Sequence, residues 1–200
     1  MAEWILGRNP VYEVLRAGRR QLEELWMVRG LEKDQMVREI LSLAGEGNLS
    51  VRRVPRHQLD SLGPNHQSLA LRAGGYPYAD LPAILDRAEQ RQEPLFILLL
   101  DVLKDPQNLG TLVRSAEAVG VHGVVLPYRR TATVTPSVVS ASSGACEHML
   151  IAQANLAQTI DLLKEEGAWV FGLEGGEHGQ PPGALDLTGS IVVVVGSEGE

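Results

Sequence analysis

The second half of the chain alternates between short apolar runs and segments in which apolar residues recur at helical spacing. The continuous apolar runs at 95–100 and 191–195 are typical of strands that are covered on both faces of a sheet. Asn155 is expected to cap one of the helices, and Gly167 to end it. The pattern predicts strands at 95–101, 121–126, 149–152, 168–173 and 191–195, and helices at 109–119, 136–145 and 156–166. Strands that alternate with helices indicate a parallel sheet built from βαβ units.

The first 75 residues show a less regular mixture of short elements. Asn9, Pro10 and Gly18 predict a helix with an asparagine cap, a proline at its first position and a glycine stop. The pattern also predicts strands at 25–28, 51–54 and 68–71, a helix at 34–44 and a helical turn at 57–62. These elements are expected to form a compact αβ unit.

Glycines and polar residues separate the two patterns. Gly74, Gly75 and the polar stretch 86–94 interrupt both periodicities. The chain has 200 residues and is 44% hydrophobic, which is enough for two small cores, since domains commonly contain about 50–200 residues. The predicted fold class is α/β, with a small αβ domain at 1–75, a linker at 76–94 and a parallel-sheet domain at 95–200.

The composition indicates a soluble protein of the cytoplasm. No run of about 18 uninterrupted apolar residues occurs, so no membrane partner is expected. The amino terminus, with Glu3 and Trp4, lacks the basic and apolar regions of a secretory signal. A single cysteine, Cys146, excludes an internal disulfide and is expected in the core.

The charge distribution distinguishes the two halves. A net charge of −7 argues against a general nucleic-acid binder, because neutralisation of phosphates supplies most of the nonspecific affinity. Residues 1–75 contain 11 Lys and Arg against 9 Asp and Glu, a net charge of +2, and the remaining 125 residues have a net charge of −9. The first domain is therefore better suited to contact a polyanion.

Several common catalytic motifs are absent. The predicted strand at 95–101 leads into KDPQNLG, which lacks the G-x-G-x-x-G pattern of dinucleotide-binding proteins. The chain also lacks G-x-x-x-x-G-K-[ST], H-E-x-x-H and G-x-S-x-G, which argues against common nucleotide hydrolases, metalloproteases and esterases. The histidines show no metal-ligand spacing, so no metal site is expected.

Polar loops follow two of the predicted strands, at 101–110 and 196–200. Open α/β folds bind ligands at the carboxyl edge of the sheet, so we expect the two loops to lie at one edge. Glycine lets a ligand approach the main chain in the second loop, although a simple turn is the alternative. Arg114 could hold a phosphate with its planar guanidinium, and a surface ion pair is the alternative.

Together these segments resemble the motifs of the SpoU/TrmH family of ribose 2′-O-methyltransferases in the SPOUT superfamily. The first motif is matched by Asp101, Asp105-Pro106, Asn108-Leu109-Gly110 and Arg114-Ser115-Ala116 through Gly120, the second by Gly196-Ser197-Glu198-Gly199, and a further segment by Ser142-Ser143-Gly144-Ala145 with Glu147. The first domain, through residues 6–11 and Asn65-His66-Gln67, is similar to the substrate-binding domain of the subgroup that methylates a guanosine of 23S ribosomal RNA.

The resemblance implies a trefoil-knot SPOUT domain, a homodimer and S-adenosylmethionine as methyl donor. The residues implied for catalysis are Arg114, Asn108 and Glu198, and those implied for the donor are Gly196, Ser197, Gly199, Leu173 and Glu174. A guanidinium is a poor general base at neutral pH, so we expect Arg114 to grip a phosphate and hold the hydroxyl in line. Asn108 is expected to orient Arg114 or the ribose.

The candidate residues for RNA binding, four in the first domain and two after the predicted strand at 121–126, lie on loops, from which polar groups reach phosphates and splayed bases. They are Arg8, Asn9, His66, Gln67, Arg129 and Arg130. The alternatives are that Asn9 only caps a helix, that His66 is an ordinary loop histidine, and that the two later arginines form a solvated basic pair.

The sequence departs from the family pattern in two places. Ser68 stands where the family usually has glycine, and the sequence ends at Glu200, inside the second motif. The third motif would complete the knot and the donor pocket, so we expect this 200-residue form to bind the methyl donor poorly and to be inactive. The rival functions are methylation of transfer RNA and a non-catalytic RNA-binding or assembly role.

Overall fold

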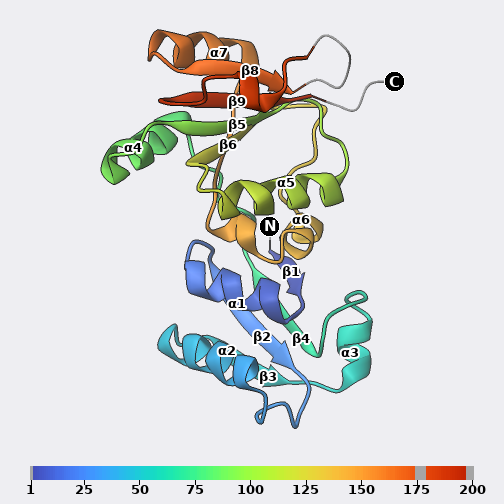
Figure 1. The fold of residues 1–200 in the computed structure, drawn as a ribbon. Helices are drawn as coiled ribbons and strands as arrows, with labels where there is room; N and C mark the ends of the chain where they lie inside the picture. The colour runs from blue at the N-terminus through green and yellow to red at the C-terminus, as the bar shows by residue number, and fades with distance from the viewer. Residues whose placement is uncertain (1, 174–178, 197–200) are drawn as a thin grey trace. The chain divides into compact units, whose positions relative to one another are not determined.

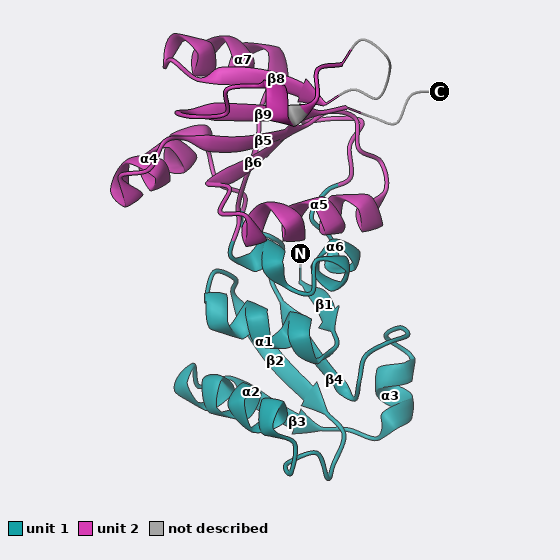
Figure 2. Cartoon of the chain, in the orientation of Figure 1, with its two compact units in different colours: residues 1–77, 133–148 teal, residues 78–132, 149–200 magenta. Residues whose placement is uncertain are grey.

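A computed structural model of the chain describes residues 2–173 and 179–196 and shows two compact units (Figures 1 and 2). Unit 1 consists of Met1–Pro77 and Thr133–His148, and unit 2 of Tyr78–Ala132 and Met149–Glu200. The first division, after Pro77, lies close to the expected domain boundary. The grouping of residues 133–148 with unit 1 differs from the expected arrangement, which placed them in the second domain.

Unit 1 combines a four-stranded sheet with several helices (Figure 1). Its elements are β1 (Glu3–Leu6), α1 (Arg8–Ala17), β2 (Leu22–Met27), α2 (Gln35–Glu46), β3 (Ser50–Arg53), α3 (Arg56–Asp60), β4 (Leu69–Ala73), α6 (Pro136–Ala141) and the 3-10 helix η1 (Ala145–Glu147). The strand order is β1-β4-β2-β3, in which β4 runs antiparallel to β1 and β2, and β2 runs parallel to β3. The sequence did not predict β1, because four residues are too few to establish a period of two.

The start of α1 differs from the prediction. Gly7 is the N-cap residue and has a φ of +96°, a conformation that glycine adopts without steric cost. The helix therefore begins at Arg8, and Asn9 lies inside its first turn, where it is not the cap. Pro10 is still tolerated, since N–H groups in the first turn have no partner within the helix. The predicted stop at Gly18 is confirmed.

The segment 133–148 packs against α1 and β1 of unit 1. The helix expected at 136–145 ends at Ala141, because Ser143 and Gly144 have φ values of +53° and +89°. A Cβ atom at Gly144 would lie 2.5 Å from the Cβ of Glu13, so only glycine allows this turn to approach α1 so closely. Contacts distant in sequence therefore decide where this segment belongs.

A buried arginine joins the two chain segments of unit 1. Arg20 donates from Nε to Oε2 of Glu147 at 3.0 Å and from Nη2 to Oε1 at 2.7 Å, and both side chains are fully buried. Its Nη1 also donates to the Glu3 carboxylate and the Gly74 carbonyl. Burial alone would lower the pKa of Arg20, but hydrogen bonds and charges from Glu147 and Glu3 raise it above its ordinary value.

Unit 2 contains a five-stranded sheet in which all neighbouring strands are parallel. Its elements are α4 (Leu81–Arg91), β5 (Phe96–Leu100), α5 (Pro106–Ala118), β6 (Gly123–Leu126), β7 (Leu150–Gln153), α7 (Leu156–Glu165), β8 (Trp169–Leu173), the 3-10 helix η2 (Pro182–Ala184) and β9 (Ile191–Val195). The strand order is β7-β6-β5-β9-β8, which confirms the predicted parallel sheet. The order reverses between β5 and β9, and at such a reversal open α/β sheets form their ligand crevice.

A helix occupies most of the segment expected to be a linker. Asp80 caps α4 by accepting the Ala83 N–H at 3.0 Å. Ile84 and Ala88, four residues apart on one face, are buried in the core of unit 2. This segment is therefore part of the folded unit, and the connection between the units is shorter than expected.

Replacing Gly123 with alanine is expected to destabilise unit 2. A Cβ atom at this position would lie 2.5 Å from two side-chain atoms of the buried Ile84. Overpacking of a core costs about 1–3 kcal/mol, so urea denaturation should show a loss of that size in the free energy of unfolding. Gly172→Ala is the matched control, because no described atom lies within 4 Å of its Cβ position. An equal loss in both variants would contradict the prediction.

Candidate functional site

The ends of β5 and β9 lie side by side at the carboxyl edge of the unit 2 sheet. Leu100 pairs with Val195 in the strand register, and the Asp101 N–H donates to the Val195 carbonyl at 2.9 Å. In β8, Leu173 is paired with the same Val195. Asp101, Leu173 and Gly196 therefore lie at one edge, which confirms the predicted common edge for the first residue of each loop, whereas residues 197–200 lie outside the described residues.

Helix α5 begins at this edge. Asp105 caps it by accepting the Gln107 N–H at 2.9 Å, and Pro106 is its first residue. Asn108 and Arg114 both lie on α5 and are exposed. They are six residues apart, whereas side chains that meet on a helix are three or four residues apart. Helix geometry thus argues against Asn108 orienting Arg114, and contact with a ribose is the remaining expectation for Asn108.

Two residues of the expected donor site, Leu173 and Gly196, lie in the described part of the chain. Glu174, Ser197, Glu198 and Gly199 lie outside the described residues, and their roles stay predictions. Of the other two, Leu173 exposes 60% of its surface at the end of β8, and Gly196 is exposed directly after β9. The described part of the edge therefore offers an apolar side chain beside the main chain of a glycine.

A pocket of about 460 Å³ opens at the same edge, over the ends of β5, β6 and β7. Asp101, Tyr128, Arg129 and Asn155 supply its polar lining, and Tyr128 exposes 68% of its surface. Arg130 follows directly after Arg129, so the pair expected to contact RNA begins at this pocket. The sequence analysis assigned no binding role to Tyr128 or Asn155. The available signal was that each closely follows a strand of the predicted parallel sheet.

Hydrogen bonds fix the loops around this pocket. The Leu103 carbonyl accepts the Thr131 hydroxyl at 3.0 Å and the Ala132 N–H at 2.6 Å. Val102, next to Asp101, has a φ of +50°, which is uncommon for a β-branched residue and costs about 1–3 kcal/mol. Such strain persists only where the surroundings hold the backbone, and the two hydrogen bonds to the Leu103 carbonyl hold it here.

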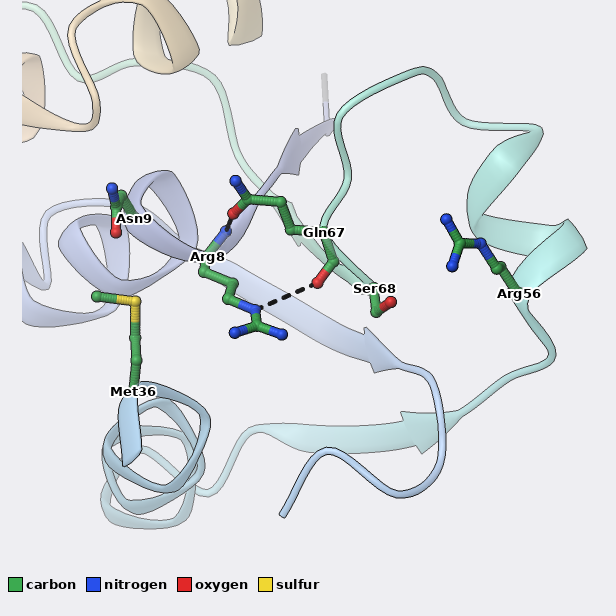
Figure 3. Close-up of a pocket in the computed structure, with 6 residues that line it drawn as sticks. All are labelled: Arg8, Asn9, Met36, Arg56, Gln67 and Ser68. Carbon is green, nitrogen blue, oxygen red and sulfur yellow. Dashed lines mark hydrogen bonds between the residues drawn. The ribbon is translucent and has the colours of Figure 1, made fainter. Parts of the chain in front are cut away.

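Unit 1 carries a second pocket, of about 540 Å³ (Figure 3). Its lining consists of Arg8, Asn9, Met36, Arg56, Gln67 and Ser68. Arg8, Asn9 and Gln67 were expected to contact RNA, and the structure brings these three together. In Figure 3, Arg56 points toward the turn that carries Gln67 from the opposite side. The sequence analysis did not single out Met36 or Arg56, because only the tertiary fold brings α2 and the start of α3 to the same pocket as α1.

Arg8 is held in a defined position at this pocket. Its Nη1 donates to the Asp34 carboxylate at 2.5 Å and its Nε to the Gln67 carbonyl at 3.4 Å, while its main-chain N–H donates to Gln67 Oε1 at 2.9 Å. The Val37 N–H and then the charge of Arg8 hold the pKa of Asp34 below its ordinary value. The pocket therefore contains a positioned guanidinium beside an ionised carboxylate.

His66 is buried and does not line the pocket. Its Nδ1 accepts the Ser68 N–H at 3.0 Å, so in the neutral ring the hydrogen lies on Nε2, which is 2.9 Å from Asp60 Oδ1. Both ring nitrogens thus have partners within the protein. A buried histidine with both ring nitrogens bonded is placed neither to contact an RNA base nor as an ordinary exposed loop residue. The structure indicates instead that His66 fixes the turn that carries Gln67.

Ser68 adopts a backbone conformation that favours glycine. Its φ is +67°, and the preceding Gln67 has a φ of +47°. A left-handed conformation costs about 1–2 kcal/mol for a residue with a Cβ atom. Ser68, which stands where the family usually has glycine, therefore keeps the left-handed backbone conformation at an added cost in strain.

Cys146 is fully buried, and burial raises the pKa of its thiol to about 12. The thiol is therefore protonated at neutral pH and is not a nucleophile, and its expected place in the core is confirmed. Across residues 2–173 and 179–196, no three His, Cys, Asp or Glu side chains gather in a way that could hold a metal ion. Within the same ranges, every helix is too short or too polar to cross a membrane.

Two family models match the chain. The SpoU rRNA Methylase family matches residues 95–200, which include β5, α5 and β9. The model described as RNA 2′-O ribose methyltransferase substrate binding matches residues 4–79, which include the unit 1 pocket. The two models therefore cover both of the pockets described above.

Known proteins match over almost the whole chain. YacO of Bacillus subtilis (strain 168), which is assigned to the TrmH family of tRNA/rRNA methyltransferases, is 37% identical over 99% of this chain and 79% of its own length. The crystal structure of the SpoU methyltransferase AviRb from Streptomyces viridochromogenes in complex with the cofactor AdoMet gives a TM-score of 0.77 at 20% identity, covering 98% of this chain and 73% of AviRb. A crystal structure of an RNA 2′-O ribose methyltransferase gives a TM-score of 0.74 at 21% identity, covering 100% and 72%.

The structural matches show the fold, which is the expected α/β fold with a SPOUT-type parallel sheet. The sequence matches extend over both units and include the segments at the carboxyl edge of that sheet. On this agreement of sequence and fold, the chain belongs to the SpoU rRNA methylase family.

Proposed function

We propose that the protein transfers a methyl group from S-adenosylmethionine to a ribose 2′-hydroxyl of RNA, and that its target is a guanosine of 23S ribosomal RNA. The observation that carries the proposal is the meeting of β5 and β9 at one edge, which brings Asp101 and Gly196, the first residues of the two motifs, to that edge. Family membership supports methyl transfer, and the match of residues 4–79 to a ribose methyltransferase substrate-binding domain supports RNA as the acceptor.

The described residues at this edge fit a nucleoside cofactor. The exposed Leu173 offers an apolar surface to an adenine ring, and Gly196 leaves the main chain accessible. When bound, S-adenosylmethionine supplies an electrophilic methyl group on a sulfonium. In this proposal Leu173, Glu174, Gly196, Ser197 and Gly199 hold the cofactor, whose identity is supported by the AdoMet complex of AviRb.

The protein must align the methyl group with the ribose hydroxyl, and alignment of this kind can lower a reaction barrier by up to roughly 7–11 kcal/mol. We assign this alignment to Arg114, which grips the phosphate beside the target ribose and holds the 2′-hydroxyl in line. Asn108 contacts the ribose, and Glu198 positions the surrounding network. The start of α5 at the carboxyl edge supports these roles, because it places the helix beside the cofactor residues.

RNA is bound by both units in this proposal. Arg8, Asn9 and Gln67 contact it in the unit 1 pocket, whose two guanidinium groups suit a polyanion. Arg129 and Arg130 add phosphate contacts in unit 2. We further propose a cytoplasmic homodimer in which Arg114 of one protomer completes a composite site, as the resemblance implies.

Transfer RNA is the second candidate substrate. The relative YacO is assigned to a family of tRNA/rRNA methyltransferases, so its name supports both substrates. We rank ribosomal RNA first, because residues 6–11 and 65–67 resemble the subgroup that methylates 23S ribosomal RNA, and the match of residues 4–79 to a substrate-binding domain supports a dedicated RNA-binding module.

Incubation with labelled S-adenosylmethionine and either 23S rRNA or bulk tRNA is expected to label the ribosomal RNA. Nuclease digestion and mass spectrometry should then identify 2′-O-methylguanosine, because the proposed acceptor is a ribose hydroxyl. A protein extended to include the third family motif should be measured in parallel. Label on a base would contradict the proposed reaction, label only in tRNA would favour the second substrate, and RNA binding without transfer in either form would indicate a non-catalytic role.

A further inference from the structure

We propose that the pocket at the ends of β5, β6 and β7 holds a guanine base of the RNA, and that the Asp101 carboxylate recognises it. This inference rests on the proposed function, because it assigns the base whose ribose accepts the methyl group. The residues that carry it are Asp101, Tyr128, Arg129 and Asn155, all of which line the pocket.

The strand order separates this pocket from the expected cofactor residues. Leu173 and Gly196 follow β8 and β9, which lie on one side of β5, whereas β6 and β7 lie on the other. Asp101 follows β5 itself: its N–H donates to the Val195 carbonyl, and the residue also lines the pocket. A base in the pocket would place its ribose near β5, where the two halves of the edge meet.

Asp101 offers acceptors only. The residue is exposed, and within the part of the chain that the structure describes its carboxylate has no hydrogen bond or ion pair. A carboxylate accepts through two oxygens and donates nothing. Guanine is the one RNA base with two adjacent donors, N1–H and N2–H, on its Watson–Crick edge, whereas the other bases place an acceptor beside a donor. Asp101 therefore matches guanine and repels the edges of the others.

Asn155 supplies the complementary donor. Asn155 caps α7, and its Oδ1 accepts the Gln158 N–H at 3.2 Å. The Nδ2 group of the same amide is then the atom that can donate to a ligand. Guanine O6 is an acceptor next to N1–H. Asp101 follows β5 and Asn155 follows β7, with β6 between them. Two strand spacings put their main chains roughly 10 Å apart, which leaves room for a flat ring between the two side chains.

Tyr128 and Arg129 provide the other two contacts that a nucleotide needs. Proteins recognise unpaired RNA bases by stacking them on aromatic rings, and Tyr128 exposes 68% of its surface at this pocket. The Arg129 guanidinium next to it can bind the phosphate of the same nucleotide.

The pocket is held in shape before any ligand binds. The Leu103 carbonyl joins the loop after β5 to the loop after β6 through Thr131 and Ala132. The Ala154 N–H donates to the Leu126 carbonyl at 2.9 Å, which joins the ends of β7 and β6. A fixed arrangement of this kind lowers the ordering cost of binding.

Titration with guanosine and adenosine 5′-monophosphates, followed by amide NMR, tests the proposal. We expect the guanosine nucleotide to shift the signals of Tyr128 and Ala157 and to bind at least about tenfold more tightly than the adenosine nucleotide. Asp101→Asn should abolish this preference, because the amide keeps one acceptor and places a donor against one of the two guanine donors. Tyr128→Ala should weaken both nucleotides, and Tyr128→Phe should bind both as the unaltered protein does.

Asp86→Asn is the matched control for the carboxylate, because Asp86 is exposed on α4 and does not line the pocket. It should keep the full preference for the guanosine nucleotide. Equal binding of the two nucleotides, or an unchanged preference in Asp101→Asn, would overturn the proposal. Displacement of the guanosine nucleotide by S-adenosylhomocysteine would also overturn it, since the pocket would then belong to the methyl donor.

Measuring methyl transfer to RNA by the same variants distinguishes a failure of the base assignment from a failure of the proposed function. If the unaltered protein methylates RNA and Asp101→Asn methylates guanosine with the same selectivity, the base assignment fails and the function stands. If the guanosine preference depends on Asp101 but no RNA accepts a methyl group, even from a form that includes the third family motif, the function fails and the pocket assignment stands.

Discussion

Replacing Arg114 with lysine is expected to slow single-turnover methyl transfer by about 100-fold or more. Lysine keeps the positive charge but loses the planar guanidinium, which can bind a phosphate through two parallel hydrogen bonds. Removal of a positioned donor from an active site commonly costs about 10²–10³ in rate. The rate should be measured with enzyme in excess over RNA and with a form of the protein that transfers methyl groups, so that product release does not mask the chemical step.

Arg91→Lys is the matched control for this substitution. Arg91 ends α4 and is exposed, away from the carboxyl edge of the sheet, so its replacement should leave the rate unchanged. A near-normal rate in Arg114→Lys would show that a point charge is sufficient and would rule out the proposed grip on the phosphate. A reduced rate with normal RNA affinity would place the effect on alignment of the hydroxyl.

Replacing Glu147 with glutamine is expected to lower the free energy of unfolding by about 3 kcal/mol. Arg20 would remain fully buried with one of its two carboxylate partners gone, and the new amide would point a donor at the guanidinium. Urea denaturation followed by circular dichroism measures the loss. Because Glu147 lies in η1 and Arg20 in the first chain segment, the loss should appear in the unfolding of unit 1.

Glu3→Gln provides the comparison, since Glu3 binds the same arginine but its side chain is 24% exposed. Water can replace part of that contact, so a loss of no more than about 1 kcal/mol is expected. The double variant Arg20→Met with Glu147→Leu removes both buried charges and should recover part of the stability lost in Glu147→Gln. Equal losses in Glu147→Gln and Glu3→Gln would contradict the argument.

The sheet of unit 2 was predictable because its signals are local. Each buried parallel strand is a continuous apolar run, and each helix has its own cap, such as Asn155 before α7. The extent of α4 was missed, since its amphipathic pattern is short and glycines precede it. The grouping of 133–148 with unit 1 was also missed, because it depends on Gly144 fitting against Glu13, more than 100 residues away in the sequence.

The candidate site was predictable as far as motifs and strand ends define it. The sequence predicted that Asp101 and Gly196 lie at the same edge of the parallel sheet, and the pairing of Leu100 with Val195 agrees. It could not show that His66 is buried or that Gly7 caps α1, because both follow from how the turn before β4 packs. Tyr128 carried no motif, and only the folded sheet reveals that it lines a pocket.

The chain passes between the two units three times, after Pro77, after Ala132 and after His148. Neither unit therefore corresponds to an uninterrupted stretch of the gene. A fragment ending at Pro77 would lack α6 and η1, and Arg20 would lose Glu147. Recombination that transplants the amino-terminal unit onto another enzyme must bring residues 133–148 with it, or find a replacement that covers the same apolar surface.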